Sequence, residues 1–261
     1  MSSVMQSTSD ARRRLYEWFA STPGRLVLEA ELEQLNRILP NLFGYYVVQV
    51  GRLSPVDMLS HTRVLNAFIV EIDRNLSECP YPRVLGTPSA LPVGSDSVDV
   101  VLLPHVLEFE QNPHQALREA QRALVPEGSV LISGFNPWSM LGLSRLALRR
   151  RGLAPWTGHF LGLNRVKDWL ALLGFKVTGI ETYFFRPPLR SERLMSRLRS
   201  MESLGARAWP YLAGAYLLTA KKKVTPLTPI RPRWSARRGL VNVGLAEPSA
   251  RGAIHGAGIH V

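Results

Sequence analysis

The sequence has little cysteine and no long apolar run. Its single cysteine, Cys79, cannot form a disulfide within the chain, and the N-terminal residues lack the pattern of a signal peptide. The longest mostly apolar stretches, 98–107 and 209–220, are shorter than the roughly 20 residues that a membrane-spanning helix needs. We therefore expect a cytoplasmic protein without a transmembrane segment.

The motifs of several familiar sites are missing as well. The sequence has no HExxH motif and no paired CxxC motifs, and it has neither the GxSxG nor the P-loop spacing. These absences speak against serine hydrolysis and lead us to expect no metal site. The segment 45–53, YYVVQVGRL, has the composition of a strand but ends in one glycine, Gly51, rather than in a glycine-rich loop.

What the chain does have is an ordinary globular composition with a strong excess of positive charge. Its 261 residues are 46% hydrophobic and 20% charged, enough for one domain with a sizeable core, and the net charge is +12. Much of the excess lies after residue 220 and in the arginines of 145–151 and 186–207. The basic tail favours weak contacts with anionic partners such as nucleic acid or an acidic membrane surface.

The segment 84–135 carries the clearest pattern of secondary structure. The apolar runs VDVVLL, from residue 98, and SVLISGF, from residue 129, predict two parallel strands covered on both faces. Between them Asn112 is placed to cap a helix that Pro113 begins. Alternation of strand and helix predicts an α/β fold with a doubly wound, mostly parallel sheet.

Segments on either side extend this pattern. AFIVEI, from residue 67, predicts another strand, and Asn164 is expected to cap a helix that stops at Gly174. The last two apolar runs have no full helix between them, which predicts an antiparallel edge of the sheet. We divide the chain into a helical lead-in (1–40), a central domain (41–220) and a basic, disordered tail (221–261).

Ligands of open α/β sheets bind beyond the carboxyl ends of the central strands, so the residues at those ends are the candidates. Glu71 lies 20 residues after Gly51 and is placed to accept hydrogen bonds from both hydroxyls of a ribose, with Asp73 as the second choice. The loop 86–92 offers backbone groups and a hydroxyl to a purine. The alternative is that both acids are solvated charges at a strand end and that the loop is a plain turn.

Three further strand ends carry candidates for contact with a substrate. His105 suits a general base near neutral pH, and Glu108 can orient it or the substrate. Asn136 and Trp138 offer an amide and an aromatic wall. Each of these residues has a structural alternative, in which the histidine is simply hydrogen-bonded and Asn-Pro-Trp simply begins a helix.

With these residues laid out, a family resemblance becomes visible. The stretch 90–135, ALPVGSDSVDVVLLPHVLEFEQNPHQALREAQRALVPEGSVLISGF, resembles the middle of class I S-adenosylmethionine-dependent methyltransferases of the type 11 kind. A weaker resemblance extends over 42–220, and GFNPWS and PLTPIRP resemble marks of a bacterial branch of methyltransferase-like proteins whose glycine loop is degenerate.

The resemblance implies a Rossmann-like, seven-stranded sheet with an antiparallel last strand and a site for S-adenosyl-L-methionine. Two departures stand out: Gln49-Val50-Gly51-Arg52-Leu53-Ser54 replaces an acid followed by GxGxG, and Thr87 replaces an aspartate. Arg52 must then point away or contact the cofactor carboxylate. The cofactor-binding residues expected are Gly51, Glu71, Thr87, Ser89, Ala90, Leu91, Pro104, His105 and Val106.

The leading hypothesis is a methyltransferase with an unidentified small or macromolecular acceptor, which the arginines suggest is anionic. His105 would be its catalytic base, with Glu108, Asn136 and Trp138 at the substrate. The alternative is a non-catalytic methyltransferase-like protein that binds nucleic acid, a membrane surface or a protein through its basic segments. A nicotinamide-dependent oxidoreductase is a weaker third hypothesis, because binding of its cofactor depends more directly on the GxGxxG loop that this chain lacks.

Overall fold

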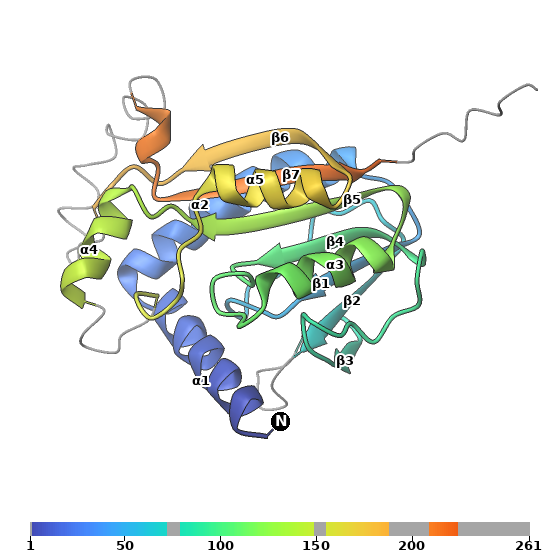
Figure 1. The fold of residues 1–261 in the computed structure, drawn as a ribbon, viewed down its shortest axis with the longest axis horizontal. Coiled ribbons are helices and arrows are strands. Elements are labelled where there is room, and N and C mark those ends of the chain that lie inside the picture. The colour runs from blue at the N-terminus through green and yellow to red at the C-terminus, as the bar shows by residue number, and fades with distance from the viewer. Residues whose placement is uncertain (1, 72–78, 149–154, 188–208, 224–261) are drawn as a thin grey trace, which may run out of the picture. The chain divides into compact units, whose positions relative to one another are not determined.

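A computed structural model describes residues 2–71, 79–148, 155–187 and 209–223. Seven strands form one sheet in the order β3-β2-β1-β4-β5-β7-β6 (Figure 1). Their bounds are β1 (Tyr46–Val50), β2 (Asn66–Glu71), β3 (Arg83–Leu85), β4 (Val98–Pro104), β5 (Leu124–Phe135), β6 (Phe175–Tyr183) and β7 (Ala215–Lys222).

The pairing of the strands confirms the predicted fold class. Neighbouring strands from β3 to β5 are parallel, as the near-continuous apolar sequences of β4 and β5 predict. The antiparallel part is made by β7, which pairs with β5 on one side and with the edge strand β6 on the other. The protein therefore has a Rossmann-like, doubly wound α/β sheet whose β6–β7 edge is antiparallel.

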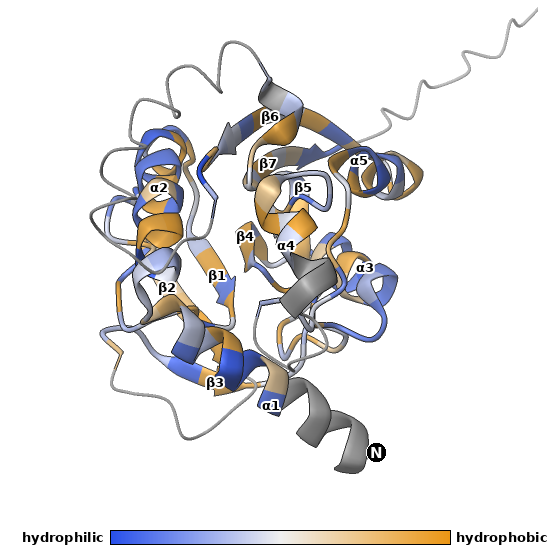
Figure 2. Ribbon diagram, turned by 90° about the vertical axis from the view of Figure 1, so that its left-hand side faces the viewer, coloured by the Kyte–Doolittle hydropathy of each residue, from blue (hydrophilic) through white to orange (hydrophobic). Residues whose placement is uncertain are grey.

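Helices cover both faces of the sheet. Figure 2 shows α2 on one side and α3 and α5 on the other, while Figure 1 shows α1 and α4 at the end toward which β4 and β5 point. Short 3-10 turns follow α2 and precede β7. The bounds are α1 (Ser2–Phe19), α2 (Thr22–Ile38), η1 (Leu39–Asn41), α3 (Pro113–Ala123), α4 (Met140–Leu148), α5 (Leu163–Leu172) and η3 (Pro210–Leu212).

The ends of the helices follow local chemistry. The Asn112 side chain accepts a hydrogen bond from the backbone of Gln115, which confirms the predicted cap of α3. Gly174 adopts φ +76 after α5, the left-handed geometry that glycine allows. The prediction for Asn164 is wrong, because α5 begins at Leu163 with Gly162 as its N-cap and no side chain caps it.

Alternation along the strands divides the core into two layers. In β4, Leu102 packs in the layer under α1 and α2, whereas Val101 and Leu103 pack in the layer under α3 and α5. All three side chains are almost completely buried. Burying a side chain of this size stabilises the fold by roughly 2 kcal/mol, so the centre of the sheet is rigid support for whatever its ends carry.

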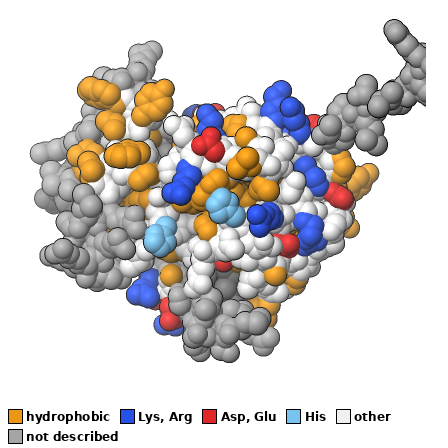
Figure 3. All heavy atoms as spheres, in the orientation of Figure 1, with side chains coloured by type: hydrophobic (Ala, Val, Ile, Leu, Met, Phe, Trp, Pro, Cys, Tyr) orange, Lys and Arg blue, Asp and Glu red, His pale blue; other side chains and the backbone are white. Residues whose placement is uncertain are grey.

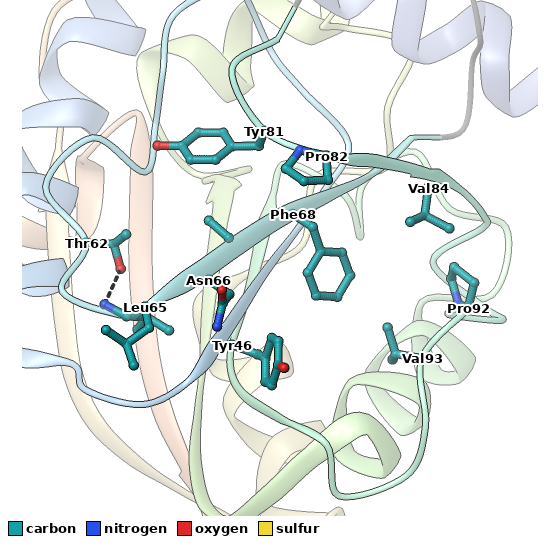
Figure 4. Close-up of a pocket in the computed structure, with 12 residues that line it drawn as sticks. Tyr46, Thr62, Leu65, Asn66, Phe68, Tyr81, Pro82, Val84, Pro92 and Val93 are labelled. Atoms are coloured by element: carbon teal, nitrogen blue, oxygen red, sulfur yellow. Dashed lines mark hydrogen bonds between the residues drawn. The ribbon is translucent and has the colours of Figure 1, made fainter.

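One hollow lies away from the carboxyl ends of the strands. It has a volume of about 620 Å³ and is lined by the start of β2 and by mostly apolar side chains, among them Tyr46, Phe68, Val84 and Pro92 (Figure 4). Among the described residues, this part of the sheet has no helix over it, and Val84 is exposed. Glu71 lies at the opposite end of β2, while Pro92, the last residue of the loop 86–92, forms part of the wall of the hollow.

Candidate functional site

The strand order reverses between β1 and β4, and the described site residues gather at the carboxyl ends on either side of that point. Gly51 follows β1 with φ +71, and its backbone N–H donates to the carbonyl of Val70, 2.7 Å away. The guanidinium of Arg12, from α1, lies directly over this glycine. A Cβ atom added to Gly51 would be 1.9 Å from Nη2 of Arg12, so no larger residue fits here without moving that side chain.

The acid expected to bind ribose is buried at the end of β2. Oε1 of Glu71 accepts a hydrogen bond from Nε of Arg52, and both side chains are removed from solvent. Arg52 therefore contacts the acid of β2, and the orientation toward a cofactor that the sequence suggests for it stays a prediction. Oε2 of Glu71 is buried and has no hydrogen-bond partner within the described ranges. Asp73 lies outside the described residues.

The loop expected to hold adenine is a tight turn beside this acid. The N–H of Ala90 donates to the carbonyl of Thr87 at 3.1 Å, and the Leu91 side chain is buried next to the turn. The hydroxyl of Ser89 is already engaged, since it donates to Oε1 of Glu110 at 2.8 Å. The turn can thus offer backbone groups, the Thr87 hydroxyl and an apolar wall.

His105 begins the segment after β4 in a left-handed conformation, φ +46, between Pro104 and the buried Val106. Its Nδ1 lies 2.8 Å from Oε2 of Glu108, and its Nε2 lies 3.4 Å from Oε2 of Glu31. Burial alone lowers the pKa of His105, but the two carboxylates more than reverse this and raise it to about 9.

This environment does not suit a general base. The imidazole is fully buried, carries a proton at neutral pH and has a carboxylate at each nitrogen. A base must present a free lone pair to its substrate, which this environment disfavours, and the catalytic role expected of His105 stays a prediction. In the structure the imidazole joins α2 to the end of β4 through its two carboxylate neighbours.

The residues expected at the substrate are used in different ways. Oε1 of Glu108 accepts from the backbone N–H of Phe135, so both of its oxygens have partners. The amide of Asn136 donates to the carbonyls of Tyr211 and Ala213, at 2.7 and 3.0 Å, and thereby ties β5 to the approach of β7. These contacts show Asn136 in a structural role.

Trp138 is 74% exposed and follows Asn136 at the start of α4. Figure 3 shows hydrophobic side chains gathered at the corner of the molecule that carries η3 and α4, and scattered basic and acidic side chains over α3 and α5. The indole can reach a bound molecule only from this outer surface, so the structure leaves its role as a prediction.

Two site residues were missed because they belong to the helical lead-in. Arg12 shares a face of α1 with Leu15 and Phe19, and Glu31 shares a face of α2 with Leu28 and other buried residues. A charged residue within an apolar helical stripe is the sequence signal that marks them, because such a charge is buried with the stripe.

A pocket of about 490 Å³ opens beside these residues. It is lined by Ala11 and Arg14 of α1, by residues 108–111 and by residues 157–159. Glu108 and Glu110 face it, and Gly158 allows Phe109 to pack closely, since a Cβ there would be 2.8 Å from the phenyl ring. The pocket adjoins the strand ends and is large enough for a small molecule or the end of a larger one.

Two negative findings concern the described residues only. None of their helices combines the length and the hydropathy that spanning a bilayer requires. Within the same ranges, no three histidine, cysteine or acidic side chains are grouped so that they could hold a metal ion.

Comparison with known proteins connects this geometry to a family. The family described as "Methyltransferase domain" matches residues 56–132. The uncharacterized protein YafS of Escherichia coli is 33% identical over 206 residues, which cover 78% of this chain and 80% of YafS. The chain belongs to the class I S-adenosylmethionine-dependent methyltransferases, type 11-like. The resemblance seen in the sequence is thereby confirmed.

Two proteins named as methyltransferases are more distantly similar to this chain. A solved methyltransferase of Thermotoga maritima, a possible histamine N-methyltransferase, superimposes with a TM-score of 0.60, covering 79% of this chain and 93% of its own. At 18% identity it shows the shared fold alone. A malonyl-[acyl-carrier protein] O-methyltransferase of Methylovorus is 27% identical over 116 residues, 44% of this chain and 38% of its own length.

Proposed function

We propose that this methyltransferase-family protein binds S-adenosyl-L-methionine at the carboxyl ends of β1 and β2 and transfers its methyl group to an acceptor. One observation carries the proposal. Oε2 of Glu71 is a buried carboxylate oxygen to which no described residue donates, at the position where a Rossmann-like sheet binds ribose. An unsatisfied buried oxygen is costly unless a ligand hydroxyl donates to it.

The other residues present fit the same ligand. The turn at 87–91 offers backbone groups and Leu91 beside Glu71, on the side of the switch point where a Rossmann-like sheet binds a nucleotide. The site also gathers charged side chains of both signs. Glu31, Glu71, Glu108 and Glu110 lie near Arg12, Arg52 and His105, and Arg14 lines the pocket beside Glu108 and Glu110.

When bound, the cofactor supplies an activated methyl group that a nucleophile displaces in line. The protein has to align the two reactants and keep water from the reacting centre. Buried aromatic side chains around His105, among them Phe19, Phe135 and Phe160, provide the apolar wall. Because His105 is held as a cation, we assign no proton abstraction to it, and the acceptor must supply its own nucleophile or lose its proton to solvent.

The pocket of about 490 Å³ is the entrance that we propose for the acceptor. Arg14 and His159 on its wall favour an acceptor that carries an anionic group, in line with the net charge of +12. The name of the Methylovorus relative gives an acceptor of this chemistry, malonyl-[acyl-carrier protein]. Glu110, which also lines the pocket, can receive hydrogen-bond donors of the acceptor.

Calorimetry with S-adenosylhomocysteine tests the cofactor site. Glu71→Gln keeps the shape of the side chain but removes its charge, and we expect affinity to fall about 10- to 100-fold because hydrogen bonds to a charged group are lost. Glu33→Gln, a carboxylate of α2 that is 62% exposed, is the matched control and should bind as the wild type does. No binding to the wild type at millimolar ligand would exclude the enzyme.

The second candidate, a non-catalytic protein that binds an anionic partner, rests on basic segments that lie mostly outside the described residues. It predicts no cofactor binding but association with nucleic acid or anionic vesicles that weakens with salt. Removal of residues 221–261 should abolish that association. The cytoplasmic location expected from the sequence stays a prediction.

A further inference from the structure

Arg12 presents buried hydrogen-bond donors that the protein itself leaves unused. The side chain is 8% exposed, and neither Nη1 nor Nη2 has a hydrogen-bond partner among the described residues. Burial lowers the pKa of this guanidinium to about 10, against the attraction of Glu71, Glu110 and Glu108. A buried charge with free donors is expensive, and a bound anion would offset that cost.

The neighbouring acids do not fill this role because other groups already use them. Oε1 of Glu71 is engaged by Arg52, Glu108 by His105 and the backbone of β5, and Glu110 by the hydroxyl of Ser89. Oε2 of Glu71 makes no hydrogen bond to either terminal nitrogen of Arg12. These carboxylates steady the guanidinium electrostatically without accepting from its terminal nitrogens. The planar fork of an arginine matches a carboxylate with two parallel hydrogen bonds.

The position of the Arg12 guanidinium indicates which part of a bound ligand its carboxylate partner would belong to. It lies over Gly51, directly beyond β1, where the chain lacks the glycines whose backbone would approach a cofactor. The same group lies near Glu71, on the ribose side of the proposed site. Arg14, at the acceptor pocket, is a separate cation of the same helix.

We propose that Arg12 is a specificity-determining residue that binds the amino-acid carboxylate of S-adenosyl-L-methionine. In this chain a side chain delivered by α1 replaces the backbone donors of a glycine-rich loop. The inference rests on the proposed function and adds the residue that selects a carboxylated cofactor. It also makes α1 part of the cofactor site, because Arg12 reaches Gly51 only while Leu15 and Phe19 of the same helix are packed in the core.

The test compares two ligands that differ by one group, S-adenosylmethionine and its decarboxylated form. We expect Arg12→Met to weaken binding of S-adenosylmethionine about 10- to 100-fold and to change binding of the decarboxylated ligand less than about threefold, because only one ligand offers the carboxylate. Arg12→Lys should restore part of the difference. Arg13→Met, in a neighbouring side chain that is 67% exposed, should change neither affinity.

Thermal unfolding of each variant without ligand separates binding from folding. Met fills most of the volume of the arginine stem, but Glu71, Glu108 and Glu110 lose a nearby cation, so we expect a lower unfolding temperature for Arg12→Met and read the affinity ratio only from folded protein. A variant that unfolds is replaced by Arg12→Gln, which keeps a donor and removes the charge, and the same ligand ratio is measured.

Three results would overturn the inference. Equal losses for both ligands would show that Arg12 only supports the fold of the site, and unchanged affinities would show that it contacts the acceptor or nothing. Tighter binding of both ligands to Arg12→Met would show that the side chain obstructs the site. If the wild type binds neither ligand, the proposed function itself fails and takes the inference with it.

Discussion

The buried imidazolium of His105 predicts how stability depends on pH. Its pKa in the folded protein is about 9, above the ordinary value of 6.5, because Glu108 and Glu31 favour the charged form. A group with a raised pKa stabilises the fold fully below its unfolded pKa and loses that contribution as pH rises through its folded pKa. Stability should therefore be highest near pH 6 and should fall between pH 6.5 and 9.

The magnitude follows from the size of the shift. Each unit of pKa corresponds to about 1.4 kcal/mol, so this shift is worth about 3 kcal/mol at most. Native domains have a free energy of unfolding of about 5–15 kcal/mol, so the loss of this contribution would be easy to measure. Phe19 and Phe135 also contact the imidazole ring, and they do not titrate. Burial raises the pKa of Tyr183, a neighbour of Glu31, well above 10, so this phenol stays protonated over the pH range of the experiment.

Urea denaturation at half-unit steps from pH 6 to 9.5 measures the effect. His105→Asn is the control, since asparagine tolerates the left-handed backbone at φ +46 but does not titrate. We expect this variant to be less stable at pH 6, because two buried carboxylates lose their cation, and to show a flatter dependence on pH. A wild-type stability that is constant or rises from pH 6.5 to 9 would refute the reasoning.

Two further predictions concern the frame of the site. Asn136→Ala should lower the free energy of unfolding by about 1–3 kcal/mol in denaturant titrations, because two carbonyls lose their donor. Trp138→Ala, at an exposed side chain, should change that free energy by less than about 0.5 kcal/mol. Gly24→Ala should loosen α1, since the new Cβ would lie 2.2 Å from the carbonyl oxygen of Trp18. We expect hydrogen exchange of the α1 backbone amides to become faster while exchange in the sheet stays the same. Unaltered exchange in α1 would contradict the close packing at Gly24.

Local pattern was sufficient to predict the sheet and most of its strand ends. A few adjacent residues are enough to predict each of these features: the apolar strands β4 and β5, the cap at Asn112 and the end of α5 at Gly174. Placing a residue at a strand end needs only the strand, and so Glu71 and the turn at 87–91 were found at the expected edge.

What the sequence did not reveal were partnerships between distant residues. Arg52 and Glu71 were both recognised as important, but their ion pair depends on how the loop after β1 folds back. Arg12 and Glu31 reach the site only because α1 and α2 pack on the sheet, and that docking cannot be inferred from helical spacing alone. The charged neighbours of His105 were hidden for the same reason, since Glu31 approaches its second nitrogen from a distant helix.

The contact between Glu31 and His105 also bears on the order in which the chain folds. During synthesis α2 is complete before β4 has left the ribosome, because 74 positions separate the two residues. A helix that settled early on an unfinished sheet would bury a carboxylate without its cation, which costs several kcal/mol. Final docking of the N-terminal helices is therefore expected to wait until the middle of the sheet exists, so that the first part of the chain to be made is among the last to reach its place.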